Sequence, residues 1–418
     1  MYLTYTFHYK PNETEALILG QYGYNAYKLW NVANYERHQW KKDSGVPYPN
    51  KYDQCNRLKS NFFYRNLPAQ TAQNIISLLD ESWKSFYALQ KSKKAENPHP
   101  PHYRQSAMQF VFVQNGFKVM NEDNSVIRFT IAKPVKKYLL AEHNLKVDYL
   151  YLKSCQFKKL SNIKQVRFLH LPNGEYRIGV VHEVQEAEPV SYNGRYLSID
   201  LGINNPMTCF DNANQKSFIV GKQYLSIDRW YRKEIAHYQS LNDTYNAKDN
   251  KHPKSTKRIQ RLYRRKNDSL RDYLHKMTRY VADYCHNNDI SAVIIGDITN
   301  IRKGKHWDAE GNQKLHAWPF KKIKKMLEYK LNLYGIELIS VKEQYTSQCS
   351  PTSISVCKAE AKPSNREKRG LYKDGLQIYN ADSVGAYNIM RKAIQSQIIP
   401  LEQICNPKSL SNPTKVAV

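Results

Sequence analysis

Two aspartates occupy positions at which a carboxylate could hold a metal ion. Asp200 lies inside the apolar run "RYLSIDLG", which is typical of a buried strand. A carboxylate in such a strand must be paired, bind a metal or face a cleft, because burying an isolated charge is costly. Asp382 follows Asn380 in "NADSVGAYN", the predicted first turn of a helix. An acid is also common there because the helix dipole favours it.

The elements around these aspartates follow the order of the ribonuclease H fold. We predict strands at "RYLSIDLG", "NPMTCFD" and "KSFIVG", a basic helix over roughly 253–287, a strand at "SAVIIGD", a helix ending at Gly335, a strand at "IELISVKE" and a helix capped by Asn380. In this topology the first strand lies at the sheet centre and the last helix crosses it. Asp200 and Asp382 could then share divalent metal, as in sites where two Mg²⁺ ions roughly 3.5–4 Å apart clamp a phosphodiester. Element order alone does not fix function.

The N-terminal half divides into a helical part and a part rich in strands. Residues 1–9 alternate loosely, as in an edge strand, and "TAQNIISLLDESWKSFYALQKSKKA" spaces its apolar side chains as a helix does. Three prolines in "AENPHPPHYRQ" end the helical part. In the following segment, Asn115-Gly116 and Asn173-Gly174 stand between alternating apolar runs, which predicts two hairpins and a small barrel or sandwich.

The charge of the chain indicates a polyanionic partner. The 418 residues include 64 Lys+Arg and 37 Asp+Glu, a formal net charge of +27. Nucleic acid is the first candidate and an anionic membrane surface the second, but no apolar run approaches the roughly 18 residues of a membrane span. The start "MYLTYTFHYK" does not resemble a signal peptide, and seven scattered cysteines do not suggest a disulfide scaffold. We expect a cytoplasmic protein that acts on the nucleoid, with no membrane partner.

Three motifs resemble those of the TnpB nucleases, transposon-encoded relatives of type V CRISPR effectors. They are "SIDLGINN", "YTSQC" and "NADSVGAYNI". The resemblance covers the C-terminal half well and most of the chain in layout. It implies an RNA-guided, metal-dependent DNA endonuclease whose partners are a guide RNA and a target double-stranded DNA with a short flanking motif. Asp200 matches the first RuvC aspartate of the family and Asp382 the aspartate of its third motif.

The implied fold is α+β and multidomain. A wedge-type β-barrel (residues 1–11 and 102–192) is interrupted by a helical recognition domain (12–101). A RuvC, or ribonuclease H-like, α/β nuclease domain (193–418) follows, with an insertion at 345–379 where relatives carry a zinc finger.

The second motif departs from the family, which ends this strand with a glutamate where this chain has Gly296. Asp297 comes next, but side chains alternate along a strand, so it should point away and is kept only as an alternative acid. Glu343 ends the neighbouring parallel strand and could reach across the glycine. We therefore predict Asp200, Glu343 and Asp382 as the catalytic acids and as ligands of two Mg²⁺ ions.

The insertion lacks the cysteines of a zinc finger. TnpB relatives often carry two C-x-x-C pairs there, whereas residues 345–379 hold Cys349 and Cys357 and no histidine. A structural zinc site needs four ligands. We expect no structural zinc and an insertion ordered by packing.

Several cations are candidates for phosphate contacts, although a charge run is often only a solvated helix face. The predicted nucleic-acid-binding residues are Tyr103, Arg104, Lys257, Arg258, Arg261, Arg264, Arg265, Arg271, Arg302 and Lys303.

Three other functions compete with the nuclease. An RNA-guided DNA-binding protein without cleavage, such as a transcriptional repressor, would fit the loss of the usual glutamate at Gly296. A DNA-cutting transposase shares the fold and three acids, but the layout and "YTSQC" argue against it. A nucleic-acid binder held by charge alone leaves Asp200 unexplained.

Overall fold

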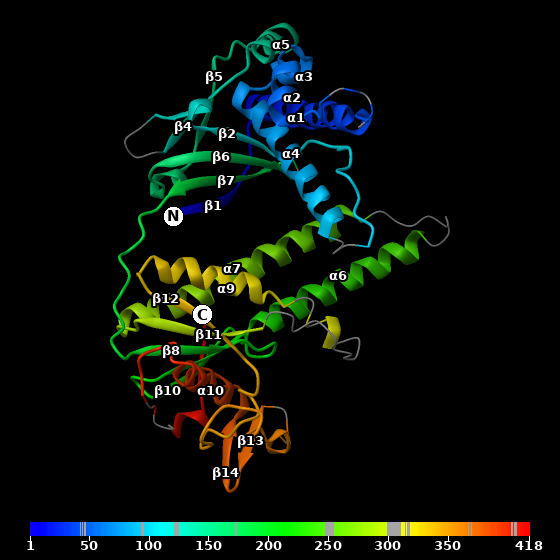
Figure 1. Ribbon diagram of the computed structural model, residues 1–418. Helices are drawn as coiled ribbons and strands as arrows, with labels where there is room; N and C mark the ends of the chain where they lie inside the picture. Colours follow the sequence, from blue (N-terminus) through cyan, green and yellow to red (C-terminus); the bar gives the residue numbers. More distant parts are fainter. Residues whose placement is uncertain are drawn as a thin grey trace. The chain divides into compact units, whose positions relative to one another are not determined.

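The computed structural model describes the chain apart from residues 42, 44, 46, 93–95, 121–124, 172–173, 247–254, 299–310, 314, 316–317, 367, 369, 403 and 405–407. The chain forms two compact units, Met1–Gln185 and Glu186–Val418 (Figure 1). Among the described residues, no helix combines the length and the apolar character needed to cross a bilayer.

The helices of the first unit are α1 (Glu13–Gln39), α2 (Lys51–Arg57), α3 (Phe62–Arg65), α4 (Ala69–Ser92) and α5 (Lys133–His143). A capping box begins α1, because the Asn12 side chain accepts from Glu15 N and the Glu15 carboxylate accepts from Asn12 N, both at 2.9 Å. The predicted stripe on α4 is confirmed at Ile75, Leu79 and Trp83, which are buried. Helix α5 was not predicted in this strand-rich part. A proline near its first turn starts it, and Val135 and Leu139 form its buried face.

The strands of the first unit lie in two sheets. A four-stranded sheet has the order β1 (Tyr2–Tyr9), β7 (Tyr176–Glu183), β6 (Ile163–His170) and β2 (Phe110–Val113). A three-stranded sheet has the order β3 (Phe117–Val119), β4 (Val126–Thr130) and β5 (Tyr149–Lys153). The first strand is at a sheet edge, as predicted, whereas the wedge-type barrel remains an expectation.

One of the two hairpin predictions in this unit is correct and the other is wrong. Strands β6 and β7 pair antiparallel around Gly174, whose φ of 79° suits a tight turn. The Asn115-Gly116 pair instead lies in a short 3₁₀ turn, and β2 and β3 on its two sides belong to different sheets. Gly116 is buried there, and a Cβ would lie 3.1 Å from the Phe112 ring. The glycine provides space for an aromatic side chain rather than a hairpin conformation.

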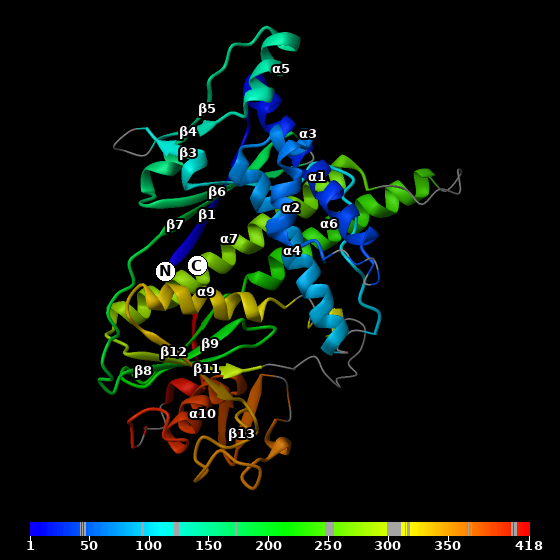
Figure 2. The ribbon, with the colours of Figure 1, turned by 45° about the horizontal axis from the view of Figure 1, so that its top comes forward.

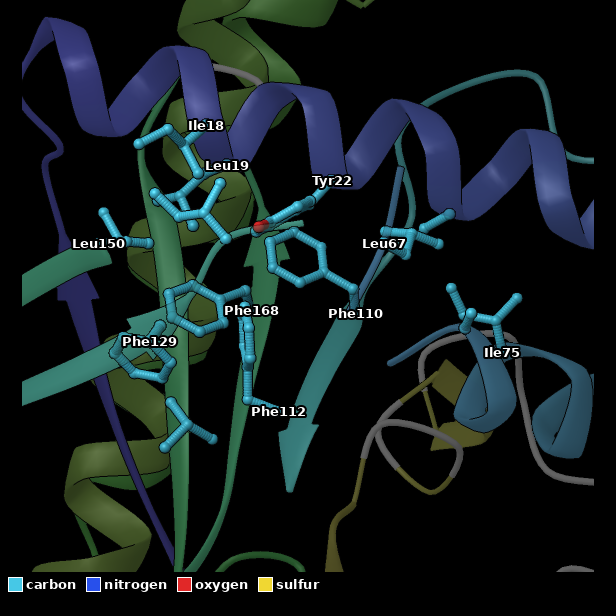
Figure 3. Packing of buried hydrophobic residues seen from close by; sticks show 14 of the residues in the cluster. Ile18, Leu19, Tyr22, Leu67, Ile75, Phe110, Phe112, Phe129, Leu150 and Phe168 are labelled. Atoms are coloured by element: carbon cyan, nitrogen blue, oxygen red, sulfur yellow. The ribbon is translucent and has the colours of Figure 1, made fainter. Parts of the chain in front are cut away.

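An aromatic core joins helix and strands in this unit. Figure 3 shows Tyr22 of α1 directed toward Phe110 of β2 and Phe168 of β6. The Phe110 and Phe168 rings stack with centroids 5.2 Å apart. The Tyr22 hydroxyl donates to Thr130 O and accepts from Ala132 N, both at 3.2 Å, which fixes α1 against the start of α5.

The second unit contains a six-stranded sheet. Its order is β12 (Glu337–Lys342), β11 (Ala292–Asp297), β8 (Tyr196–Asp200), β9 (Met207–Asp211), β10 (Lys216–Val220) and β15 (Thr414–Val416). Its helices are α6 (Tyr224–Asn246), α7 (Lys257–Asn287), α9 (Phe320–Asn332) and α10 (Ala381–Gln395). Strand β8 lies inside the sheet and pairs parallel with β11 and antiparallel with β9, as predicted. Helix α6 and strand β15 are additions to the predicted order.

The alternating side chains of β8 and β11 face different helices. Leu197 and Val293 belong to the core with α7 and α9, whereas Tyr196 and Ile294 belong to the core with α10. Figures 1 and 2 show α7 and α9 on one side of the sheet and α10 on the other. The Ser198 hydroxyl donates to Ala386 O at 2.7 Å, so α10 crosses directly over β8.

The insertion at 345–379 is attached to α10 by a buried polar network. It ends in a hairpin that β13 (Leu371–Asp374) forms with β14 (Gln377–Asn380). Asn388 is fully buried and donates to Thr346 O at 2.8 Å and to Cys349 O at 2.9 Å. Arg391 donates to Ser350 O and to Asn388 Oδ1, both at 2.9 Å. Side chains of α10 therefore satisfy the backbone of the insertion.

Replacing Asn388 should loosen this attachment. Asn388→Ala leaves two buried carbonyls and part of a guanidinium unsatisfied, at a cost of about 2–4 kcal/mol. We expect the thermal unfolding midpoint of the second unit to fall by roughly 5–15 °C and limited proteolysis within 345–379 to accelerate. Gln395→Ala is the control, because this exposed side chain on the same helix accepts one hydrogen bond, from Val356 N. Equal effects of the two variants would contradict the role of Asn388.

Candidate active site

Asp200 lies at the C-terminal end of β8, on the face of the sheet that α10 covers. Two residues earlier, Ser198 points to the same face and bonds to α10. Gly385 of α10 makes room for the acid, since a Cβ on this glycine would lie 2.5 Å from Asp200 Oδ2. Close packing of α10 against the sheet therefore fixes the position of the first acid.

Glu343 follows directly after β12 and fills the space beside Gly296 of β11. The two strands are parallel, and Gly296 pairs in register with Val341. Glu343, two residues further, shares the face of both. A Cβ on Gly296 would lie 2.0 Å from Glu343 Oε1 and 2.4 Å from its Cγ. The predicted geometry is therefore present: the glutamate side chain occupies the space that any other residue at 296 would fill.

Asp382 is presented by the first turn of α10. The predicted cap is confirmed, because the Asn380 side chain accepts from the backbone N of Asp382 and of Ser383, both at 3.1 Å. The loop after β8 reaches back to the same acid, and Asn205 Nδ2 donates to Asp382 Oδ2 at 2.6 Å. Gly202 permits this tight loop, since a Cβ there would lie 2.9 Å from Asn205 O.

The electrostatics of Asp200 show that the three acids converge. Its pKa is raised well above the usual carboxyl value, first by burial and then by the charges of Glu343 and Asp382. Arg366, a half-buried residue of the insertion, acts in the opposite direction and lowers the pKa of Asp200. Two acids therefore raise the pKa of Asp200, and Arg366 is the one cation among the groups that change it.

The donor set suits a hard divalent cation in type and charge. Carboxylate oxygens are the ligands that Mg²⁺ prefers, and a cation would relieve the repulsion that raises the pKa of Asp200. In the described part of the chain, however, no three acidic, histidine or cysteine side chains are grouped closely enough to hold a metal ion as they stand. The charges of Glu343 and Asp382 therefore act on Asp200, but the three carboxylates are not close enough together to form a complete set of metal ligands.

Asp297 does not join the cluster. It pairs in register with Lys342, one residue from Gly296, so its side chain lies on the opposite face of β11. The residue is exposed, and it is not among the groups that shift the pKa of Asp200. The alternation argument from the sequence is consistent with this placement.

Tyr103 and Arg104 lie on the first unit, in an extended segment attached to α1. The segment is held by Asn31, whose side chain donates to Arg104 O at 2.8 Å and accepts from Arg104 N at 2.7 Å. Arg104 lies over the Trp30 ring at 4.8 Å, and Tyr103 stacks on His38 with ring centroids 5.4 Å apart. Both side chains keep exposed surface while their backbone is fixed.

The cations predicted on the basic helix lie on α7. Lys257, Arg258, Arg261 and Arg265 are exposed, whereas Arg264 and Arg271 are half-buried. Arg271 pairs with Asp268 at 3.3 Å, and Arg258 lies over the Tyr238 ring of α6 at 3.9 Å. Arg302 and Lys303 lie outside the described residues. Contact with nucleic acid stays a prediction for this whole set.

Sequence reasoning missed three residues of this site. Asn205 and Gly385 lie within the motifs "SIDLGINN" and "NADSVGAYN", so their proximity to the acids was a usable signal. Arg366 lies in the insertion, and no pattern in the sequence connects it to Asp200.

Two family models match the second half of the chain. A model described as "Probable transposase" matches residues 179–302, and one described as "Cas12f1-like, TNB domain" matches residues 320–389. Together they include Asp200, Glu343 and Asp382.

Individual proteins match over most of the chain. The TnpB-like protein ORF457 of Acidianus two-tailed virus is 23% identical over 407 residues, covering 88% of this chain and 81% of the relative. Among solved structures, Cas12f1 in its sgRNA–target DNA complex has a TM-score of 0.58 at 15% identity, covering 90% of this chain and 83% of that one. The mini-RNA-guided endonuclease CRISPR-Cas_phi3 has a TM-score of 0.50 at 11% identity, covering 94% and 92%. The two structures show a shared α+β fold, and the family models and the viral relative support the resemblance to the TnpB family.

Proposed function

We propose that the protein is an RNA-guided, Mg²⁺-dependent DNA endonuclease that hydrolyses phosphodiester bonds at a RuvC-type site. Its partners would be a guide RNA and a target double-stranded DNA with a short flanking motif, in keeping with the RNA-guided structures that share its fold. The observation that carries the proposal is the occupation of the space beside Gly296 by Glu343, on the same face of the sheet as Asp200 and Asp382.

Each residue of the site has a definite part in this proposal. Asp200, Glu343 and Asp382 would hold the Mg²⁺ ions, which when bound supply Lewis-acid activation of water and of the phosphodiester. Asn205 orients the Asp382 carboxylate through its hydrogen bond. Gly385 sets how closely α10 approaches Asp200. Arg366 contributes positive charge at the same place.

The alternative function is guided DNA binding without cleavage. The glycine at position 296 favours it, because the family glutamate is absent there. The contact between Gly296 and Glu343 argues against it, since the missing carboxylate has a replacement in nearly the same space.

The first prediction separates these two functions. We expect Asp200→Ala and Glu343→Gln to reduce cleavage of a matched duplex by at least about a hundredfold while guided binding is unchanged, because each removes a proposed metal ligand. Cleavage and binding would be measured in Mg²⁺ on protein purified with its RNA.

Asp297→Asn is the matched control and should cut like wild type, because Asp297 lies on the other face of β11. If Asp297→Asn alone abolishes cutting, the third acid is assigned to the wrong strand. If wild type binds its target and does not cut, the guided binder is the correct function.

The second prediction tests the exchange of the acid between strands. Gly296→Ala should displace the Glu343 carboxylate and impair cutting strongly, with little loss of stability because a flexible side chain can move away. The double variant Gly296→Glu with Glu343→Gly returns the acid to β11 and should recover part of the activity. Thermal unfolding would verify that all variants fold. Full activity in Gly296→Ala would show that the position of Glu343 is irrelevant.

The third prediction concerns stability without metal. Because the pKa of Asp200 is raised in the folded protein, its ionisation opposes folding as the pH rises through that pKa. Asp200→Asn should therefore raise the thermal midpoint at neutral pH in chelator by several degrees, and the gain should shrink as the pH falls below the raised pKa of folded Asp200 and vanish below the usual carboxyl pKa of the unfolded chain.

Added Mg²⁺ should stabilise wild type more than Asp200→Asn, because a ligand that binds only the folded state raises its stability. Asp297→Asn, at an exposed position, should leave both measurements unchanged. A fall in the midpoint of Asp200→Asn in chelator would contradict the electrostatic account.

A further inference from the structure

One face of α6 carries an exposed tryptophan among cations, and neither the acid site nor the predicted basic helix includes it. Between Ser226 and Ser240, all the exposed positions except Gln239 form a single helical stripe: Ser226, Arg229, Trp230, Lys233, Ala236, His237 and Ser240. We call Arg229, Trp230, Lys233 and His237 the α6 basic face. These seven positions include no carboxylate, and the next exposed acid of α6 is Asp243, one turn beyond Ser240.

The rest of α6 is used to pack against α7. Tyr224, Asp228 and Ile235 are buried on the side opposite the stripe. Asp228 pairs with Lys266 of α7 at 2.8 Å, and the Tyr231 hydroxyl lies 3.0 Å from the Ser269 hydroxyl of α7. Helix α7 therefore covers the buried side of α6. Contacts with α7 do not explain why the opposite side carries the α6 basic face.

Trp230 distinguishes this face from an ordinary solvated helix. Its side chain is 56% exposed, whereas Trp30, Trp83 and Trp318 are each at most 5% exposed. Single exposed apolar residues are common, but this ring packs edge-on against Tyr231 at 4.7 Å and has Lys233 one turn away, so an exposed aromatic surface lies beside a cation. Among the described residues, Arg229 and Lys233 form no ion pair within the chain.

We propose that the α6 basic face binds an unpaired nucleotide of a single-stranded nucleic acid, with the base stacked on Trp230 and the adjacent phosphates on Arg229 and Lys233. Stacking on aromatic rings and neutralisation by cations are the two interactions by which proteins hold single strands. Residues three and four apart on a helix are neighbours, so Lys233 lies one turn from the Trp230 ring. A regular duplex would leave the ring unused, because its bases are already stacked.

Other partners fit the face less well. A membrane surface would need an apolar helix face, and the apolar side of α6 is packed against α7. A protein partner would be expected to bring carboxylates to the cations, and it remains a possible outcome of the test. The inference takes from the proposed function only that the partner is a nucleic acid. It concerns the binding of that partner and not its cleavage.

The experiment measures binding of the full-length protein to fluorescein-labelled oligothymidylate and oligouridylate over a range of salt concentrations. Both polymers are tested before and after the protein is loaded with its co-purifying RNA. If binding is lost on loading, the guide RNA is the source of the nucleotide; if binding persists, a DNA strand is.

Trp230→Ala should weaken binding roughly 5- to 150-fold and leave the dependence on salt unchanged, because it removes stacking and no charge. Trp230→Phe should keep most of the affinity. Lys233→Gln should reduce the slope of log affinity against log salt by about 0.7, the value for one phosphate contact on a single strand.

Lys276→Gln is the matched control, because this α7 lysine is exposed and pairs with Asp272 at 2.9 Å. It should change neither the affinity nor the slope. Wild-type binding by Trp230→Ala, or an equal loss in Lys276→Gln, would overturn the inference. A change in self-association with unchanged binding to both polymers would assign the face to a protein contact and overturn it as well. Cleavage is not measured, so failure here leaves the proposed nuclease intact, and failure of the nuclease leaves this result interpretable.

Discussion

The second unit is organised around Asp200, a carboxylate whose charged form is opposed by burial and by the charges of Glu343 and Asp382. Burial and the two neighbouring acids raise the pKa of Asp200 well above its usual value, so the folded chain bears an electrostatic cost there. Close packing imposes this arrangement. Helix α10 approaches β8 through Gly385, and β12 delivers Glu343 over Gly296. A glycine lies against each of these two acids, because there is no volume left for another side chain.

Parallel pairing explains how an acid can change strands without changing place. Strands β11 and β12 run side by side in fixed register, so residues beyond their C-terminal ends open on one edge of the sheet. A glutamate at the end of β11 or one just after β12 can therefore supply a carboxylate to the same volume. Only one of them fits, since a Cβ at 296 and the Glu343 side chain would overlap. The two positions are thus sterically coupled.

The sequence was sufficient where a local pattern has one physical solution. The alternating faces of β11 separate Asp297 from the cluster, and Asn380 caps α10 as its residue type predicts. The sequence was insufficient where tertiary contacts decide. Asn115-Gly116 looks like a hairpin turn, but Gly116 is there to accommodate the Phe112 ring between two sheets. Likewise, the position of Arg366 near Asp200 depends on how the insertion folds back on α10, and no periodicity encodes that.

The repulsion at Asp200 opposes folding, and this helps to decide whether the acids are left over from a lost nuclease activity. Asp200 and Glu343 come from different strands, and a neutral residue at either position would relieve the repulsion and favour folding. A protein that only binds its target has no physical reason to keep a half-buried glutamate against a glycine. A protein that must hold divalent cations does, because the repulsion that opposes folding in their absence becomes attraction for the ions. The same repulsion that opposes folding without metal is therefore the one that would give the site its affinity for metal.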